Sequence, residues 1–187
     1  MTRNKIKQLF KHKKILVSGH TGFKGSWLCI FLSQLGAEVT GYALKPATKP
    51  SLYNLANIKK LIKKSIIADV RNSKKLYSEI KKSKATVLFH LAAQPLVRYS
   101  YENPIETWKT KVNGTINVLD SLRLLNQKCI SIFITSDKCY KNSEKIKGYV
   151  ESDILGGTDP YSASKAATEI AFNSYLPALC PLYVYPQ

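Results

Sequence analysis

An apolar run that ends in three evenly spaced glycines constrains the fold of this chain more than any other feature. The run begins at Ile15, and glycines follow at positions 19, 22 and 25. Ser26–Leu35 continues as a largely apolar helical segment, and a second strand is expected at Glu38–Leu44. A strand, a glycine turn, a helix and another strand in this order predict the first βαβ unit of a parallel sheet.

Each glycine of this turn has a predicted task. Gly19 would allow the chain to turn sharply after the strand, Gly22 would let a pyrophosphate approach the backbone, and Gly25 would let the helix pack closely on the sheet. The N–H groups at the start of the helix would then face the phosphates. Glycine spacing alone is a weak signal, so the prediction of a dinucleotide site depends on the strand and helix around it.

The rest of the chain alternates between strand-like and helix-like segments. Asp159 is a favourable N-cap residue for the last helix, and Pro160 follows it at the first helical position. Such alternation predicts an α/β fold, namely a doubly wound parallel sheet with helices on both faces and a ligand site at the carboxyl ends of its strands. Strands are expected at 65–68, 86–91 and 130–135, and helices in the polar stretch after 51 and at 73–83, 104–125 and 160–175.

Composition indicates one globular domain. The chain has 187 residues, 44% of them apolar, which is enough to bury a substantial core. Residues 1–175 are assigned to a dinucleotide-binding Rossmann domain and residues 176–187 to an atypical tail. No apolar run reaches the ~18 residues of a membrane span, so we expect a cytoplasmic protein without a membrane partner. The four cysteines lack metal-type spacing, and neither a metal site nor a disulfide is expected.

The net charge of +17 raises the alternative of a nucleic-acid-binding protein. Of the 29 basic residues only four are arginines, and the lysines are spread over the predicted helices. We therefore expect a solvated, lysine-rich surface and no nucleic-acid partner. The same charge is compatible with the attraction of an anionic small substrate.

Tyr161 and Lys165 are four residues apart in the last predicted helix, so both side chains project from the same face. A lysine ammonium near a phenol favours the phenolate. It draws the pKa of a tyrosine from its usual value near ~10 toward the range in which a general base works. Such a pair by itself is typical of an exposed helix surface. Together with the glycine turn, it predicts a catalytic pair.

These motifs carry a family resemblance over most of the chain. The three glycines, Asp69, the run from Leu91 to Ala93, Asn113 and the Tyr161–Lys165 pair resemble the extended short-chain dehydrogenase/reductase family. Three longer strings, at 19–28, 90–98 and 135–140, closely resemble the CDP-glucose 4,6-dehydratases within that family. The resemblance implies conversion of CDP-glucose to CDP-4-keto-6-deoxyglucose, a step toward the dideoxy sugars of O-antigen.

The resemblance also implies catalytic roles. Tyr161 would take the proton of the sugar 4-hydroxyl while hydride leaves C4 for NAD⁺, and Ser136 would hydrogen-bond the 4-oxygen. Lys138 would remove the C5 proton, Asp137 would protonate the departing 6-hydroxyl, and hydride would return to C6. Lys165 would hold the nicotinamide ribose. Because the hydride is returned, the reaction is a dehydration without net oxidation.

The pair of Asp137 and Lys138 follows the fifth predicted strand. An acidic and a basic residue after a strand are usually a surface turn, but the carboxyl end of a strand in this fold is where a ligand binds. Lys138 can act as a base only if its pKa falls well below ~10.4. Burial and the charge of Lys165 would both lower it.

For NAD as the cofactor, the resemblance implies contacts with the glycine turn, the ends of the third and fourth strands and the last two helices. Asp69 would accept the adenine amino group. The second strand ends in Ala43-Leu44-Lys45 and lacks the acidic residue usual in NAD sites, so NADP, with Lys45 near a 2′-phosphate, stays an alternative. The implied contacts are Gly19, Thr21, Gly22, Phe23, Lys24, Gly25, Asp69, Val70, Leu91, Ala92, Ala93, Asn113, Tyr161 and Lys165.

Two other functions stay open. A nucleotide-sugar 4-epimerase would share the glycine turn and the tyrosine–lysine pair but would not need Asp137 and Lys138. Members of the family continue well beyond position 187 with a C-terminal substrate domain, so the chain resembles a truncated form, and a non-catalytic dinucleotide-binding module is the second alternative.

Self-association is also expected. The family pairs the helices that match 104–125 and 160–175 across a twofold axis, which implies a homodimer or a larger homo-oligomer. The apolar stripe of the first helix runs through Trp108, Val112, Ile116 and Leu119. The alternative is that the stripes of both helices only pack on their own sheet.

Overall fold

The computed structural model of this protein describes residues 3–179, which divide into two compact units. The first unit takes in the described residues up to Ala92 together with Leu125–Ile134, and the second takes in Ala93–Leu124 together with the described residues from Thr135 onward. The first unit contains the sheet, and the second contains the helix that carries Tyr161. The assignment of residues 1–175 to one domain stays a prediction.

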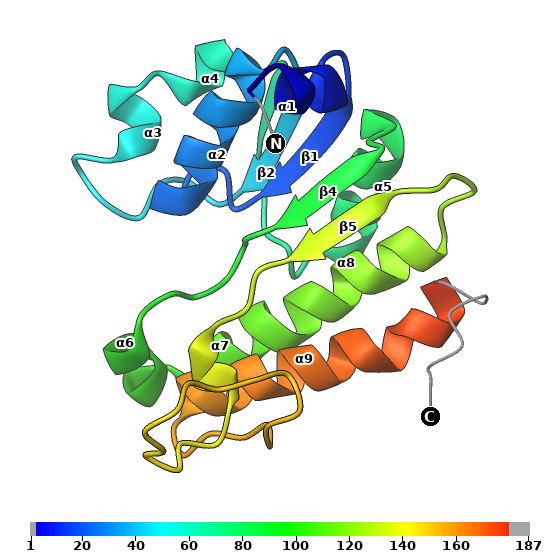
Figure 1. The fold of residues 1–187 in the computed structure, drawn as a ribbon. Helices are drawn as coiled ribbons and strands as arrows, with labels where there is room; N and C mark the ends of the chain where they lie inside the picture. Colours follow the sequence, from blue (N-terminus) through cyan, green and yellow to red (C-terminus); the bar gives the residue numbers. More distant parts are fainter. Residues whose placement is uncertain (1–2, 180–187) are drawn as a thin grey trace. The chain divides into compact units, whose positions relative to one another are not determined.

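Within the described residues, five strands form a single parallel sheet in the first unit (Figure 1). Their order across the sheet is β3-β2-β1-β4-β5, so the direction of winding reverses between β1 and β4. In such sheets the reversal marks the ligand site at the carboxyl ends of the strands. The predicted doubly wound parallel sheet is confirmed. The strands are β1 Lys14–Ser18, β2 Glu38–Ala43, β3 Lys64–Ile67, β4 Val87–His90 and β5 Ile130–Phe133.

Helices cover both faces of this sheet. Successive residues of a strand point to opposite sides, so neighbouring residues of β1 pack against different helices. Ile15 and Val17 of β1 pack with Cys29 and Leu32 of α2 in one buried cluster. Leu16 lies between them in sequence, is fully buried, and points to the opposite face; α5 packs against β1. The helices of the first unit are α1 Arg3–Phe10, α2 Phe23–Gln34, α3 Leu52–Leu55, α4 Ile58–Leu61 and α5 Ser73–Ser83.

The second unit is built around α9, which packs against each of its other helices and turns (Figure 1). The helix expected at 104–125 is present, but a π-turn, η1, interrupts it. α9 extends beyond its predicted end at Tyr175, so residues 176–179 of the predicted tail are helical; residues 180–187, including Cys180, lie outside the described residues. The elements are α6 Val97–Glu102, α7 Pro104–Trp108, η1 Lys109–Asn113, α8 Gly114–Arg123, the 3-10 turn η2 Asp137–Cys139, and α9 Pro160–Leu179.

The long loop between η2 and α9 is fastened at its base. Tyr140 forms an antiparallel bridge with Leu155, and the amide of Gly156 donates a hydrogen bond to the carbonyl of Cys139 at 2.9 Å. These contacts bring the residues after β5 next to the start of α9, which is where the predicted catalytic residues lie.

No helix within residues 3–179 is long and apolar enough to cross a membrane. The same part of the chain contains no group of three His, Cys, Asp or Glu side chains arranged to hold a metal ion.

Candidate functional site

The glycine turn follows β1 and lies against the backbone that follows β4. Gly19 has a φ of +77°, and a Cβ atom there would lie 2.8 Å from the backbone of Leu91 and Ala92. The hydroxyl of Ser18 holds this neighbouring backbone by accepting hydrogen bonds from the amides of Leu91 at 3.1 Å and Ala92 at 3.2 Å. Only glycine combines this backbone conformation with so close an approach, so the sharp turn expected at Gly19 is found.

The other two glycines differ from one another in the space around them. A Cβ atom at Gly22 would lie 3.4 Å from the carbonyl oxygen of Gly19, an ordinary contact, whereas one at Gly25 would lie only 2.1 Å from the same oxygen. Gly25 therefore lets the start of α2 approach the turn closely, at Gly19 and His20, and the same helix packs on β1 through Cys29 and Leu32. Gly22 leaves its space unfilled by protein, which fits a position kept open for a ligand.

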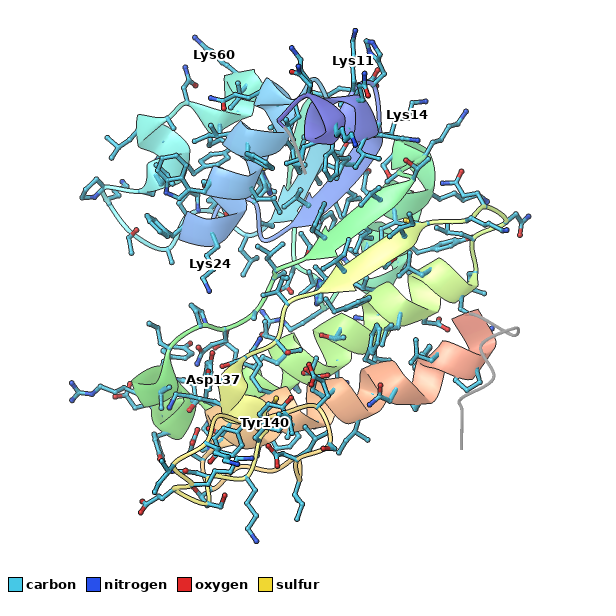
Figure 2. All side chains as sticks on the ribbon, in the orientation of Figure 1. Lys11, Lys14, Lys24, Lys60, Asp137 and Tyr140 are labelled. Atoms are coloured by element: carbon cyan, nitrogen blue, oxygen red, sulfur yellow. The ribbon has the colours of Figure 1, made fainter. Side chains whose placement is uncertain are left out.

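The N-terminus of α2 has no side-chain cap, because its N-cap residue is Gly22. The first turn of the helix contains no acidic residue, and Figure 2 shows Lys24 extending from it. Exposed N–H groups at the positive end of a helix attract phosphate. The residues present at this end thus fit the pyrophosphate of a dinucleotide.

A histidine inside the glycine turn was not singled out from the sequence. His20 is completely buried, its Nε2 lies 2.7 Å from the hydroxyl of Ser65, and its ring meets that of Tyr53 edge to face at 5.5 Å between centroids. Its Nδ1 is buried and has no hydrogen-bond partner among residues 3–179. Burial lowers the pKa of His20 to about 4. The neutral imidazole links the turn to β3 and α3, and its only sequence signal is a large ring between two glycines.

Two further predicted contacts lie at the carboxyl edge of the same sheet. Thr21 donates a hydrogen bond to the carbonyl of Leu44 at 2.8 Å, which ties the turn to the end of β2. Asp69, after β3, accepts hydrogen bonds from the backbone amide and from the guanidinium Nε of Arg71, both at 2.8 Å. Burial alone would raise the pKa of Asp69, but the hydrogen bonds and charge of Arg71 lower it. The carboxylate is therefore ionised and already oriented by Arg71.

In the second unit, Asp159 forms the predicted N-cap of α9. Its Oδ1 accepts hydrogen bonds from the backbone amides of Tyr161 and Ser162, both at 2.9 Å, and its Oδ2 accepts one from the Ser162 hydroxyl at 2.6 Å. This cap fixes the first turn of α9 and with it the backbone of Tyr161.

Tyr161 lies beside the turn that follows β5. Ser136 lies close enough to the Tyr161 side chain to affect its pKa, and the Ser136 hydroxyl donates a hydrogen bond to Oδ1 of Asp137 at 2.9 Å. Burial raises the pKa of Tyr161, the charges of Asp137 and Asp159 act in the same direction, and the nearby Ser136 side chain opposes them. The pKa is therefore raised, whereas the sequence argument expected Lys165 to lower it.

Lys138 and Asp137 were expected to act on C5 and C6 of the sugar, and Lys138 was expected to be buried. Asp137 and Lys138 form the turn η2 and are both exposed; Figure 2 labels Asp137 at this turn. The argument for Lys138 as a base assumed burial, which this structure does not provide. Of the three residues of η2 only Cys139 is buried, and the sequence pattern did not fix which side chain of this turn would be enclosed.

A buried lysine that the sequence analysis missed occupies the position next to Tyr161. Lys111, in η1, is 2% exposed, and its Nζ lies 3.0 Å from the centroid of the Tyr161 ring. Lys165 is also buried, at 6% exposure. Asn113, the residue of this helix expected to support the site, is exposed. The sequence did contain one signal for its burial. Lys111 is four residues from both Thr107 and Thr115, and all three lie on the buried face of this helix.

The two units divide the predicted cofactor contacts between them. Gly19 through Gly25, Asp69, Val70, Leu91 and Ala92 belong to the first unit, while Ala93, Asn113, Tyr161 and Lys165 belong to the second. Among the predicted catalytic residues, the structure brings Ser136, Asp137 and Tyr161 together.

Comparison with known proteins finds one matching family model and several relatives of similar sequence. The family model "GDP-mannose 4,6 dehydratase" matches residues 16–179. CDP-glucose 4,6-dehydratase of Salmonella typhimurium is 45% identical over 169 residues, which are 90% of this chain and 47% of that protein. CDP-paratose 2-epimerase of Salmonella typhi is 29% identical over 174 residues, covering 83% of this chain and 51% of that protein.

Among solved structures, Pal from Bacillus thuringiensis superposes with a TM-score of 0.75 at 27% sequence identity, over 87% of this chain and 51% of that one. The chain thus spans about half the length of the curated relatives that it matches.

Proposed function

Because the chain belongs to the GDP-mannose 4,6 dehydratase family, we propose that it carries the cofactor-binding and proton-transfer half of a nucleotide-sugar 4,6-dehydratase. The substrate proposed is CDP-glucose and the product CDP-4-keto-6-deoxyglucose. The observation that carries this proposal is the 45% identity with a CDP-glucose 4,6-dehydratase over nearly the whole chain. The contacts among Tyr161, Ser136 and Asp137 are its structural support. We further propose that the protein acts in the cytoplasm.

The cofactor proposed is NAD. The uncapped start of α2 and the open space at Gly22 would receive its pyrophosphate. The ionised carboxylate of Asp69 keeps lone pairs that could accept a hydrogen bond from the adenine amino group. When bound, NAD⁺ would accept a hydride from the sugar and later return it. Lys45 at the end of β2 makes NADP the alternative to be tested.

The residues of the second unit would move the protons. Tyr161 would accept the proton of the sugar 4-hydroxyl once its phenol is ionised, and Ser136, which lies near the phenol, would orient the sugar oxygen. Lys165 would hold a ribose hydroxyl and add positive charge near the phenolate. Asp137, exposed in η2, would give a proton to the departing 6-hydroxyl, and Lys138 would take the proton from C5.

An assay of the chain with NAD⁺ and CDP-glucose tests the proposal, with absorbance or NMR detection of a 4-keto-6-deoxy product. Activity that is lost on replacing Asp137 or Lys138 by alanine would support the assigned roles. If C4 is inverted while the 6-hydroxyl is kept, the protein is an epimerase. If NAD⁺ binds and no nucleotide sugar does, the chain acts as a dinucleotide-binding module, and the dehydratase proposal is wrong for it.

We also propose that the chain forms a homodimer or larger homo-oligomer through α7, α8 and α9. Ile105 and Trp108 on α7 and Ile170 on α9 are large apolar side chains that are exposed in the single chain, and α7 packs on α9; a second copy of the chain would cover them. Sedimentation at micromolar concentration should show a species larger than a monomer. Ile170→Lys should dissociate it, and Leu55→Lys, at an exposed residue of α3, should not. A monomer in the unmodified chain would refute the proposal.

A further inference from the structure

The π-turn η1 gives two lysines of the same turn opposite environments. Lys109 is exposed, whereas Lys111 is 2% exposed and lies in a turn that packs on α9. A π-turn widens the helix by one residue and changes which side chains face a neighbouring element, and such turns are frequent at functional sites. Here the widened turn sends a lysine, rather than an apolar residue, into the interior.

The amino group of Lys111 contacts both the backbone and the ring of Tyr161. Its Nζ donates a hydrogen bond to the backbone carbonyl of Tyr161 at 3.3 Å and lies 3.0 Å from the centroid of the Tyr161 ring. Within residues 3–179, no carboxylate forms an ion pair with Lys111. The aromatic face and the carbonyl are therefore the direct contacts that compensate the buried ammonium, and a desolvated cation on an aromatic face contributes about 2 kcal/mol.

The charged groups that act on Lys111 come from α9 and the residue before it. Burial and, after it, the charge of Lys165 lower the pKa of Lys111 to about 7, although the charge of Asp159 acts in the opposite direction. The ammonium and the neutral amine are thus close in free energy at neutral pH. Loss of a proton from Tyr161 would favour the charged form of Lys111, because the two sites are coupled.

We propose that Lys111 is a positioning residue for Tyr161: its amino group holds the phenol ring in one orientation against α9 and stabilises the phenolate when it forms. This inference rests on the proposed function, in which Tyr161 accepts the proton of the sugar hydroxyl. The resemblance assigned a supporting role on this helix to Asn113, which is exposed; the geometry assigns it to Lys111.

The test that does not depend on turnover is NMR of the 187-residue chain with ring-¹³C-tyrosine, the Tyr161 signal being the one lost in Tyr161→Phe. In the unmodified chain, the Tyr161 signal should show a titration step near pH 7, because the charge on its ring face changes there. Lys111→Met should abolish the step, and Lys109→Met should retain it. A Tyr161 signal without such a step, or with a step that survives in Lys111→Met, would overturn the proposal.

A second measurement covers the case in which Lys111→Met does not fold. The ε-methylene protons of Lys111 should resonate upfield because of the Tyr161 ring current. Tyr161→Leu should move them downfield, while Tyr161→Phe, which keeps the ring, should leave them nearly unchanged. Equal shifts in the two variants would contradict the stacked geometry.

Kinetics separate this inference from the proposed function. If the chain converts CDP-glucose, Lys111→Met should lower kcat about tenfold and leave KM within about twofold, since it acts on proton transfer rather than on sugar binding. An equal loss in Lys109→Met would contradict the assignment. If no turnover is found, the proposed function fails while the NMR results still decide whether Lys111 positions Tyr161.

Discussion

A Cβ atom at Gly41 would lie 2.3 Å from the imidazole ring of His20. Gly41 is in the middle of β2, and His20 is in the glycine turn after β1, so the strand leaves room for a side chain of the turn. The imidazole ring that fills this space is fully buried and hydrogen-bonded to the hydroxyl of Ser65. The glycine turn thus depends on a glycine that lies outside it in sequence.

We expect Gly41→Ala to lower the free energy of unfolding by about 1–3 kcal/mol, because the added methyl group overpacks a filled site. The displaced His20 should also disturb the turn and weaken NAD binding. Urea unfolding and an NAD titration measure the two effects. Gly148→Ala is the matched control, since no atom lies within 4 Å of a Cβ there. Equal stability of the two variants would contradict the prediction.

The second prediction separates the ligand role of one glycine from the packing role of another. Gly22→Ala should keep the stability of the chain within about 0.5 kcal/mol, since the added methyl meets only an ordinary contact and φ is −76°. It should still lower NAD affinity about tenfold, because the methyl would stand where the pyrophosphate approaches. Gly25→Ala, with a Cβ 2.1 Å from the Gly19 oxygen, should lower both stability and affinity.

Thermal unfolding and NAD titration of both variants are the measurements. An unstable Gly22→Ala chain, or a Gly22→Ala chain with full NAD affinity, would show that Gly22 is not kept open for the cofactor.

The sequence was sufficient to predict the sheet because its strands are short runs between clear helical segments, and the central strand β1 is an apolar run buried on both faces. An apolar run such as that at 86–91 has few alternatives in a chain of this size, and β4 lies within it at Val87–His90. The helix α5 begins and ends where it was predicted, at Ser73 and Ser83. Its start follows Asn72, whose side chain caps it by accepting a hydrogen bond from the Lys75 amide, a signal that is local in sequence.

The catalytic half of the candidate site was less predictable. Periodicity arguments assume 3.6 residues per turn, so the π-turn η1 could not be foreseen, and the buried face of the helix came to include Thr107 and Lys111. The expected stripe residue Trp108 is instead 39% exposed. Burial of Lys138 was likewise inferred from its place after a strand, but a turn residue can face either way.

The third prediction concerns the cap of α9. Asp159→Ala removes three acceptor contacts at the start of this helix and should lower the free energy of unfolding by about 1–2 kcal/mol. Asp159→Asn keeps a side-chain oxygen for the backbone amides and should lose less than half of that. Because Tyr161 is in the capped turn, the alanine variant should also broaden its NMR signal. Urea unfolding at pH 7 checks the order, and an asparagine variant as unstable as the alanine variant would contradict it.

The last prediction is a pH dependence that originates in His20. Its pKa is about 4 in the folded chain and near ~6.5 when unfolded, so between these values the unfolded chain binds the extra proton. The stability that neutral His20 contributes is therefore complete above about pH 6.5 and is lost as the pH falls toward about 4. The shift corresponds to about 3 kcal/mol at most.

Urea unfolding between pH 7.5 and pH 4 measures this loss. Because carboxylates also begin to titrate at the acid end of this range, the informative quantity is the difference between the unmodified chain and His20→Gln, which should show a smaller loss over the same range. His12→Asn should behave as the unmodified chain does, since His12 is exposed and asparagine tolerates its positive φ of 61°. Identical pH profiles for the unmodified chain and His20→Gln would mean that the buried imidazole of the glycine turn does not titrate with folding.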